Sequence, residues 1–387
     1  MTDNQTLSTV RDIMAGFAAR TGLTTDRPPT RYLWTDAFAV CNYLGLYTAT
    51  GDEQYRDLAT RLIDQVHHVL GRHRSDDERE GWISGLAGEQ AEEHPTAGGL
   101  RIGKKLPERG LNERFDQQLE WDRDGQYLHY LTKWMHALDR AAHALNDLTY
   151  NRWAMELARR VHAAFAYQPA AGGPPRLYWK MSVDLSRPLV PSMGHHDPLD
   201  VYVTYRQLVA TSPGTAGRRD LAVEIDDAEE IIWGRDWATE DPLGIGGLLT
   251  DAHRVAQLLV AGEFKRGDLV LVLLDSALLG LMGYAEQDPL NVPPSHRLGF
   301  RELGLSIGLH AGERLRALLT TAPDRFVKQD LLHQRLQSLM RYVPMAEQIE
   351  RFWLDPVHRA AGSWTEHLDI NEVMLATSLA PAGYLER

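Results

Sequence analysis

The feature that most constrains the fold is a pair of helical segments joined by a tight turn, which recurs along the chain. In the first pair, residues 34–49 are apolar and residues 56–70 are amphipathic. The intervening TGDEQY supplies Asp52 as an N-cap, and Gly71 follows the second segment, where helices commonly end. These residues predict an antiparallel helical hairpin.

Similar pairs recur without obvious sequence identity, and the segments between them show no strand-like alternation. Together they predict twelve helices in six hairpins. The remaining predicted pairs are 127–145 with 150–167, 199–211 with 218–233, 245–261 with 266–282, 300–319 with 324–342, and 366–379 with the N-terminal segment 7–20.

The two segments of most pairs differ in how their apolar residues are distributed. The first is apolar on more of its circumference, as in FAVCNYLGLY, whereas the second carries a charged face, as in YRDLATRLIDQVHHVL. We therefore expect inner and outer helices. Closing six such hairpins into a ring would bury the inner helices on both sides, so the sequence predicts an all-α (α/α)6 barrel forming a single domain over residues 1–387. An open helical solenoid is the alternative.

Composition limits the partners of the chain. A content of 43% hydrophobic and 24% charged residues is typical of a globular protein, and a net charge of -12 argues against a broad nucleic-acid or anionic-membrane surface. The single cysteine, Cys41, excludes intrachain disulfides and multi-thiolate zinc sites. The N-terminus lacks a signal-peptide pattern, and the most apolar segment, 269–282, is short for a membrane span and contains Asp275. We expect a cytoplasmic protein, and a homo-oligomer is compatible with the sequence.

The connections between helices are asymmetric in length. Those within a pair are short, whereas those between pairs are long, above all 72–124 and 168–198. In a ring of hairpins all the long connections leave at one end, where the inner helices begin with their positive dipole ends. This end is the predicted active-site face.

Aromatic, histidine and charged residues gather in these long connections and at the helix starts beside them. Aromatic rings stack on the apolar face of a sugar while charged groups bind its hydroxyls, so we expect a small carbohydrate substrate. The predicted substrate-binding residues are Trp34, Asp36, Arg101, Trp121, Arg123, Tyr127, Lys180, His195, His196, Glu302, Trp364 and His367.

Two segments resemble the six-hairpin sugar-active enzymes, which comprise the (α/α)6 glycosidases and the N-acylglucosamine 2-epimerase group. They are LGLYTATGDEQYRDLATRLIDQV and GQYLHYLTKWMHALDRAA. The epimerase resemblance implies histidine acid/base chemistry on a sugar carbon, with His129 at the start of the second inner helix. The glycosidase resemblance implies two carboxylates, one acting as acid and the other as base or nucleophile. Fold alone does not choose between them.

The main hypothesis from the sequence is a glycoside hydrolase acting on a small oligosaccharide or glycoside. Its carboxylates would be Asp197 or Asp200 from the third pair and Glu366 from the sixth, on opposite sides of the ring. Simple helix capping is the alternative role for the aspartates. The second hypothesis is a sugar epimerase or isomerase with His129 as acid/base, and the third is a non-enzymatic sugar-binding or protein-binding toroid.

The HHD motif at residues 195–197 raises the question of a metal. Adjacent residues on a turn point in different directions, and only His196 and Asp200 have helical metal-ligand spacing. We therefore expect no metal and no cofactor, and assign the histidines to sugar hydroxyls. The loop GGLRIGKKLPER, residues 98–109, carries four basic residues without a Walker motif. A solvated charged loop is the simpler interpretation, and a clamp for phosphate or uronate is the alternative.

Overall fold

The computed structural model describes residues 3–212, 214 and 220–387, and its contacts divide the chain into two compact units. Unit 1 consists of residues 1–17 and 234–387, and unit 2 of residues 18–233. Each unit is described by itself below. The organisation of residues 1–387 as one barrel domain stays a prediction.

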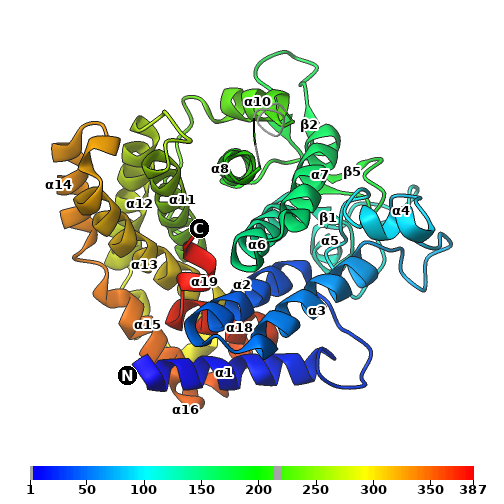
Figure 1. Ribbon diagram of the computed structural model, residues 1–387, viewed down its shortest axis with the longest axis horizontal. Helices are drawn as coiled ribbons and strands as arrows, with labels where there is room; N and C mark the ends of the chain where they lie inside the picture. Colours follow the sequence, from blue (N-terminus) through cyan, green and yellow to red (C-terminus); the bar gives the residue numbers. More distant parts are fainter. Residues whose placement is uncertain (1–2, 213, 215–219) are drawn as a thin grey trace. The chain divides into compact units, whose positions relative to one another are not determined.

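Unit 2 contains three pairs of packed helices, each joined by a short connection (Figure 1). The predicted pairs are thus confirmed, although the predicted start of the last helix at 218 lies outside the described residues. The pairs are α2 (Leu33–Thr50) with α3 (Glu53–Leu70), α6 (Leu128–Leu145) with α7 (Leu148–Phe165), and α8 (Asp197–Thr211) with α10 (Ala222–Ile232).

Local sequence explains where these helices begin and end. Gly51, at φ +69°, ends α2 in the left-handed conformation, and Asp52 then caps α3 by accepting a hydrogen bond from the Gln54 backbone N–H at 3.1 Å. Asn146 and Asp147 do the same between α6 and α7. Helix α2 is buried around most of its circumference, whereas α3 buries one face, as the predicted inner and outer roles require.

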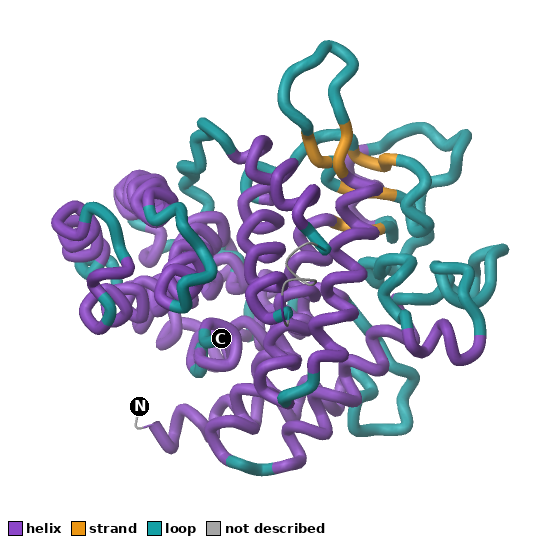
Figure 2. The backbone as a smooth tube through the Cα atoms, turned by 45° about the horizontal axis from the view of Figure 1, so that its top comes forward, coloured by secondary structure: helices purple, strands orange, loops and turns teal. Residues whose placement is uncertain are grey.

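The long connections of unit 2 contain short elements of their own (Figure 2). The strands correct the expectation of none; at two or three residues each they are too short for periodicity to reveal. Strand β4 pairs antiparallel with both β1 and β5, and β2 pairs with β3. The elements are α4 (Gly88–Glu93), α5 (Gln117–Asp122), β1 (Gln126–Tyr127), β2 (Ala166–Tyr167), β3 (Arg176–Leu177), β4 (Lys180–Met181) and β5 (Pro188–Val190).

Unit 1 contains the remaining helices, including most of α1. The predicted pairs α11 with α12 and α13 with α14 are confirmed. The elements are α1 (Asp3–Arg20), α11 (Pro242–Val260), α12 (Asp268–Glu286), η1 (Pro289–Asn291), η2 (Pro294–His296), α13 (Gly299–Thr321), η3 (Pro323–Arg325), α14 (Gln329–Leu339), α15 (Pro344–Leu354), α16 (Pro356–Arg359), α17 (Gly362–Thr365), α18 (Leu368–Leu379) and α19 (Ala382–Leu385).

Helices α11 and α13 pack backbone to backbone through glycines. A Cβ atom at Gly246 would lie 2.0 Å from the carbonyl oxygen of Gly304, and one at Gly308 would lie 2.5 Å from the Cα atom of Gly246. Because nothing larger than glycine fits, these positions fix how α11 and α13 cross.

The C-terminal helix departs from the predicted pairing. Residues 366–379 were expected to form a hairpin with 7–20, but α18 packs instead against α13 and α15. Helix α15, which no predicted helix covered, begins at Pro344, a residue suited to the first helical turn. The all-α class built from helical hairpins is confirmed in both units, and the closure of the hairpins into one ring stays a prediction.

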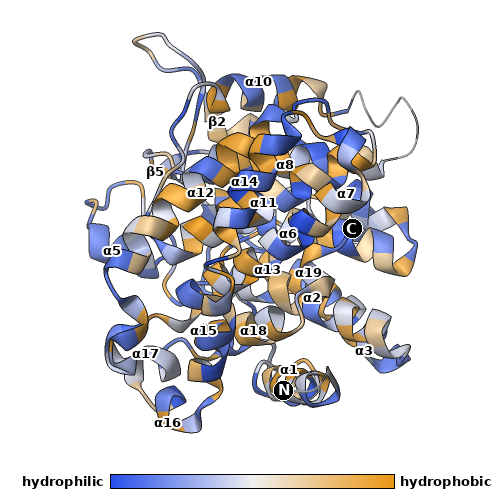
Figure 3. Cartoon of the chain, turned by 90° about the vertical axis from the view of Figure 1, so that its left-hand side faces the viewer, coloured by the Kyte–Doolittle hydropathy of each residue, from blue (hydrophilic) through white to orange (hydrophobic). Residues whose placement is uncertain are grey.

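Helix α12 is strongly apolar, as Figure 3 shows along its ribbon. Among the described residues it is the one helix whose length and composition would allow it to cross a membrane, and 56% of that stretch is buried inside the protein. A mostly buried core helix satisfies the same criteria.

Candidate functional site

Unit 2 gathers aromatic rings where α6 begins. Tyr127 precedes α6 and stacks on His129 at 5.4 Å between ring centres, and the His129 ring lies 6.0 Å from Trp179 and nearly parallel to it. The β1–β4 pairing brings Trp179 there, because Gln126 and Tyr127 lie opposite Met181 and Lys180. The first turn of α6 therefore carries a histidine set in an aromatic stack.

Helix α5 adds a further ring to this stack. Trp121 meets Trp179 edge to face at 4.8 Å and keeps 48% of its surface exposed. An exposed tryptophan on a protein surface is a common binding feature, since its flat apolar face can stack on a ligand ring. Trp121, Trp179, Tyr127 and His129 are called the aromatic stack below.

Asp197, the first residue of α8, faces His129. The distance from His129 Nδ1 to Asp197 Oδ2 is 3.8 Å, and both atoms are buried without a hydrogen-bond partner among the described residues. A Cβ atom at position 194 would lie 2.4 Å from Asp197 Oδ2, so Gly194 leaves the room that this carboxyl occupies. Buried polar atoms without hydrogen bonds are rare and point to a functional role.

Burial sets the protonation of this pair. Burial, and then the charge of Asp200, raises the pKa of Asp197 to about 7. Burial, and then the charge of Lys133, lowers the pKa of His129 to about 3. At neutral pH the imidazole is therefore uncharged and able to accept a proton, while the carboxyl is near its midpoint.

Asp200 lies one turn further along α8 and is held firmly. Its carboxylate binds Lys133 Nζ at 2.9 Å and accepts a hydrogen bond from the hydroxyl of Thr132, both on α6. The two aspartates that the sequence left as alternatives thus differ: Asp200 ties α8 to α6, and the Asp197 carboxyl is directed at His129. Lys133 and Thr132 were not predicted, although Lys133, four residues after His129, shares its helix face.

His195 and His196 lie in the turn before α8, with their rings 4.5 Å apart. His195 is exposed and His196 is half-buried. Among the described residues, no group of three or more His, Cys, Asp or Glu side chains has the geometry to hold a metal ion. Their predicted contact with sugar hydroxyls stays a prediction.

Three predicted substrate ligands of unit 2 are instead engaged by the protein. Lys180 is fully buried, with its ammonium 2.9 Å from the Glu120 carboxylate, and Arg101 forms a buried ion pair with Asp124. Arg123 pairs with Glu113. Because their donors are occupied, we assign Lys180, Arg101 and Arg123 to holding the long loop together.

Trp34 and Asp36, also predicted to bind substrate, serve the start of α2. Trp34 is buried against Phe38 at 4.5 Å between ring centres. The Asp36 carboxylate accepts a hydrogen bond from the Tyr32 backbone N–H at 2.9 Å and pairs with Arg31 at 3.3 Å. Trp34 is thus a core residue, and Asp36 stabilises the helix start.

The predicted residues of unit 1 divide in the same way. Glu302 receives two hydrogen bonds of 2.8 Å from Arg297 and one of 2.8 Å from Trp353, and the buried Trp364 stacks on Trp353 at 4.9 Å. Both have interior structural roles. Glu366 and His367 are largely open to solvent. The catalytic role of Glu366 and the binding role of His367 stay predictions.

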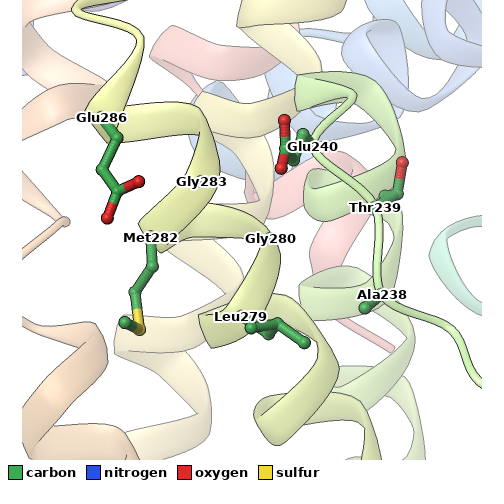
Figure 4. Close-up of a pocket in the computed structure, with 8 residues that line it drawn as sticks. All are labelled: Ala238, Thr239, Glu240, Leu279, Gly280, Met282, Gly283 and Glu286. Carbon is green, nitrogen blue, oxygen red and sulfur yellow. The ribbon is translucent and has the colours of Figure 1, made fainter.

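A hollow in unit 1 lies between α12 and residues 238–240 (Figure 4). Gly280 lets that segment pass close to α12, because a Cβ atom there would lie 1.9 Å from the Thr239 carbonyl oxygen. Its side chains are mainly Leu279 and Met282 beside acidic Glu240 and Glu286. This lining lacks the convergent acid/base groups found at His129.

Comparisons with known proteins give structural neighbours only. No family model matches the sequence, and no curated protein does. Three solved structures are similar. They are a sugar epimerase from a ruminal bacterium (9% identity, 87% of this chain and 86% of that chain, TM-score 0.45), cellobiose 2-epimerase from Spirochaeta thermophila (11%, 87% and 86%, 0.47) and cellobiose 2-epimerase from Bacillus thermoamylovorans (9%, 88% and 87%, 0.45). At this level of similarity, function has to come from the residues of this chain.

Proposed function

We propose that this chain is a carbohydrate-active enzyme, specifically an epimerase or isomerase that moves a proton at a sugar carbon next to a carbonyl group. One observation carries the proposal: His129 Nδ1 and Asp197 Oδ2 lie 3.8 Å apart, buried and without hydrogen bonds among the described residues, inside the aromatic stack. This reaction needs one group that takes a proton from carbon and returns it.

The two side chains divide the work. Ionised Asp197 accepts the Nδ1–H of His129 and so leaves Nε2 unprotonated and able to act as the base. The distance of 3.8 Å exceeds a hydrogen bond, and such contacts tighten when substrate closes the site. His129 then takes the proton from the carbon, and the C–H electrons form an enediolate with the neighbouring carbonyl. Returning the proton to the opposite face gives the epimer, and returning it to the neighbouring carbon gives the isomer.

The aromatic stack supports a sugar as the substrate. Trp121 and Trp179 offer apolar ring faces beside the proposed base, and Trp121 is nearly half exposed. An apolar ring face matches the C–H face of a sugar and leaves its hydroxyls for polar groups, including the predicted His195 and His196.

Glycoside hydrolysis is the second candidate, because a carboxyl whose pKa is raised to about 7, beside a second carboxylate, suits a general acid. That reaction also needs an ionised carboxylate free to act across the sugar ring. Asp200 is held by Lys133 and Thr132, and the predicted Glu366 belongs to unit 1. Histidine acid/base chemistry therefore ranks first, and a non-enzymatic sugar-binding role ranks third.

Solvent exchange tests the proposal. Wild-type protein is incubated in heavy water with a panel of reducing sugars, and deuterium at the carbon next to the carbonyl is followed by NMR. We expect incorporation that is lost in His129→Gln and retained in His143→Gln, a control on the same helix. Release of reducing ends from glycosides without deuterium exchange would instead establish the hydrolase. Stabilisation by sugars with neither chemistry would favour the binding role.

A further inference from the structure

A second hollow in unit 2, apart from the aromatic stack, is lined mainly by charged side chains. It has a volume of about 840 Å³ and lies between residues 68–81 and residues 101–104. Its position on the two segments that carry the predicted basic loop makes its charge the first question.

Most cations in this cleft are neutralised within the protein. Arg74 binds both carboxylate oxygens of Asp76 at 2.7 and 2.8 Å, and Arg79 binds Asp77 at 2.8 Å. Arg101 is paired with Asp124. These three arginines build the walls, and their charge is spent on the protein's own carboxylates.

Arg72 and Lys104 differ from them. The guanidinium carbon of Arg72 lies 5.6 Å from the centre of the Trp82 ring, and the ammonium of Lys104 lies 5.4 Å from the centre of the Tyr32 ring. Neither charged group makes an ion pair or a hydrogen bond within residues 3–212, 214 and 220–387. A cation held against an aromatic face keeps its N–H donors available.

Hydrogen bonds join the segments on which these two cations stand. Arg101 Nε donates to the carbonyl oxygen of Arg72 at 2.7 Å, and Arg74 Nη1 donates to the carbonyl oxygen of Lys104 at 2.6 Å. Residues 72–74 and 101–104 therefore form one continuous rim, on which Arg72 and Lys104 carry charge that no described carboxylate neutralises.

Two further groups line the cleft. The His73 side chain is 8% exposed, and its Nδ1 atom has no hydrogen-bond partner in the described part of the chain; Asp77 lies 4.0 Å away. Burial, and then the charge of Arg79, lowers the pKa of His73, so its neutral ring offers one N–H at pH 7. Glu80 also lines the cleft and opposes an anion.

We infer that this cleft binds the oxyanion group of the substrate, so that the substrate is a sugar bearing a phosphate or carboxylate group. Arginine matches the geometry of such oxyanions with two parallel N–H donors, and lysine adds a point charge. The inference rests on the proposed function for the identity of the sugar, but binding of the oxyanion by Arg72 and Lys104 can be measured by itself.

Side-chain contacts lead from this cleft to the proposed base. Lys104 lies over Tyr32, whose hydroxyl is 2.7 Å from the hydroxyl of Tyr130, and the Tyr130 ring meets His129 edge to face at 4.7 Å. An anionic group held by Lys104 would thus lie on the same wall as His129, with Tyr32 and Tyr130 between them.

Calorimetry with inorganic phosphate at constant ionic strength tests the binding step. We expect wild-type protein to bind phosphate and the Arg72→Ala/Lys104→Ala variant to bind it roughly tenfold more weakly for each lost charge-assisted contact. Lys105→Ala and Arg114→Ala remove exposed charges outside the lining and should change nothing. Glu80→Gln should bind phosphate more tightly. Equal affinity in the double variant and wild type, or no phosphate binding, would overturn the inference.

A second arm separates a substrate group from free phosphate. If the cleft holds the substrate, a sugar phosphate or a uronate should outcompete inorganic phosphate, and the neutral parent sugar should not. In the double variant, KM for the anionic sugar should rise at least about tenfold while KM for a neutral sugar stays unchanged. Phosphate binding without preference for anionic sugars would overturn the assignment to substrate and reduce the cleft to a free-anion site. Phosphate binding without any sugar chemistry would leave the cleft standing and refute the proposed function.

Discussion

Each unit contains a histidine beside a buried carboxylate, and the two pairs differ in how far their hydrogen bonds are satisfied. In unit 1, His310 Nε2 binds Glu350 at 2.9 Å while Nδ1 binds Glu313 at 3.2 Å. The same Glu350 oxygen accepts hydrogen bonds from Ser378 at 2.6 Å and Ser306 at 3.1 Å. In unit 2, the atoms that His129 and Asp197 turn towards each other have none among the described residues.

This contrast separates a structural pair from a reactive one. Burial by itself would lower the pKa of His310, but its hydrogen bonds to Glu350 and then Glu313 raise it above the usual value. Burial dominates at His129, whose pKa falls to about 3. A satisfied network holds α13, α15 and α18 together, whereas an unsatisfied buried pair leaves both groups available for proton transfer.

The largest expected effect is on turnover. Replacing His129 with Gln removes the proposed base and should lower kcat/KM by about 10³-fold, within the usual range for a general base. His310→Gln should leave kcat/KM almost unchanged, because His310 belongs to the satisfied pair. Initial rates, measured below the melting temperature of both variants, make the comparison. An equal loss in both variants would erase the distinction between the two pairs.

The second effect is on stability and belongs to the other pair. Glu350→Ala leaves His310, Ser306 and Ser378 without their shared acceptor and should lower the free energy of unfolding by about 3 kcal/mol. Glu347→Ala, at an exposed site on the same helix, should change it by less than about 0.5 kcal/mol. Urea denaturation at pH 7 measures both. A small loss in Glu350→Ala would show that the network does not hold unit 1 together.

The two pairs also show what the sequence could and could not reveal. Hairpins were predictable because their signals are local: Gly51 ends one helix and Asp52 starts the next. His129 and Asp197 could be chosen separately as catalytic candidates, but their approach depends on contacts between distant parts of a chain folded through β1 and β4. No local pattern encodes that distance.

The misassigned residues failed for a related reason. Arg101 and Lys180 have the composition of ligand-binding residues, and only the fold shows that Asp124 and Glu120 already occupy them. A charged residue in a loop is ambiguous until its partner is known. The short strands were missed because two residues cannot display an alternation.

The third effect concerns pH. Because the folded-state pKa of Asp197 is about 7, above its value in the unfolded chain, the folded state binds more protons between about pH 4 and 7. Asp197 therefore makes the free energy of unfolding fall as pH rises through this window, whereas His129, with its lowered pKa, makes it rise between about pH 3 and 6.5. Asp197→Asn removes only the first contribution. Relative to wild type, it should gain about 1–2 kcal/mol at pH 8 and nothing at pH 4.

Denaturation of Asp197→Asn and wild type across pH 4–8 gives this difference directly. Because the two proteins differ at one position only, their difference at each pH isolates the titration of this carboxyl. In the same range the wild-type kcat/KM should rise with an apparent pKa near 7, as Asp197 ionises and can accept the Nδ1–H of His129. A gain in stability that is independent of pH would point to packing and not to charge.

The smallest effect tests whether Asp200 and Lys133 tune Asp197 from one turn away. The negative charge of Asp200 raises the pKa of Asp197, and the positive charge of Lys133 lowers it. Asp200→Asn should therefore move the rise of kcat/KM to lower pH by about half a unit, and Lys133→Met should move it to higher pH by a similar amount. The double variant, which removes both charges of the 2.9 Å pair, should return close to the wild-type profile. Shifts in the same direction from both single variants would mean that the substitutions act on the position of α8 and not on the charge of Asp197.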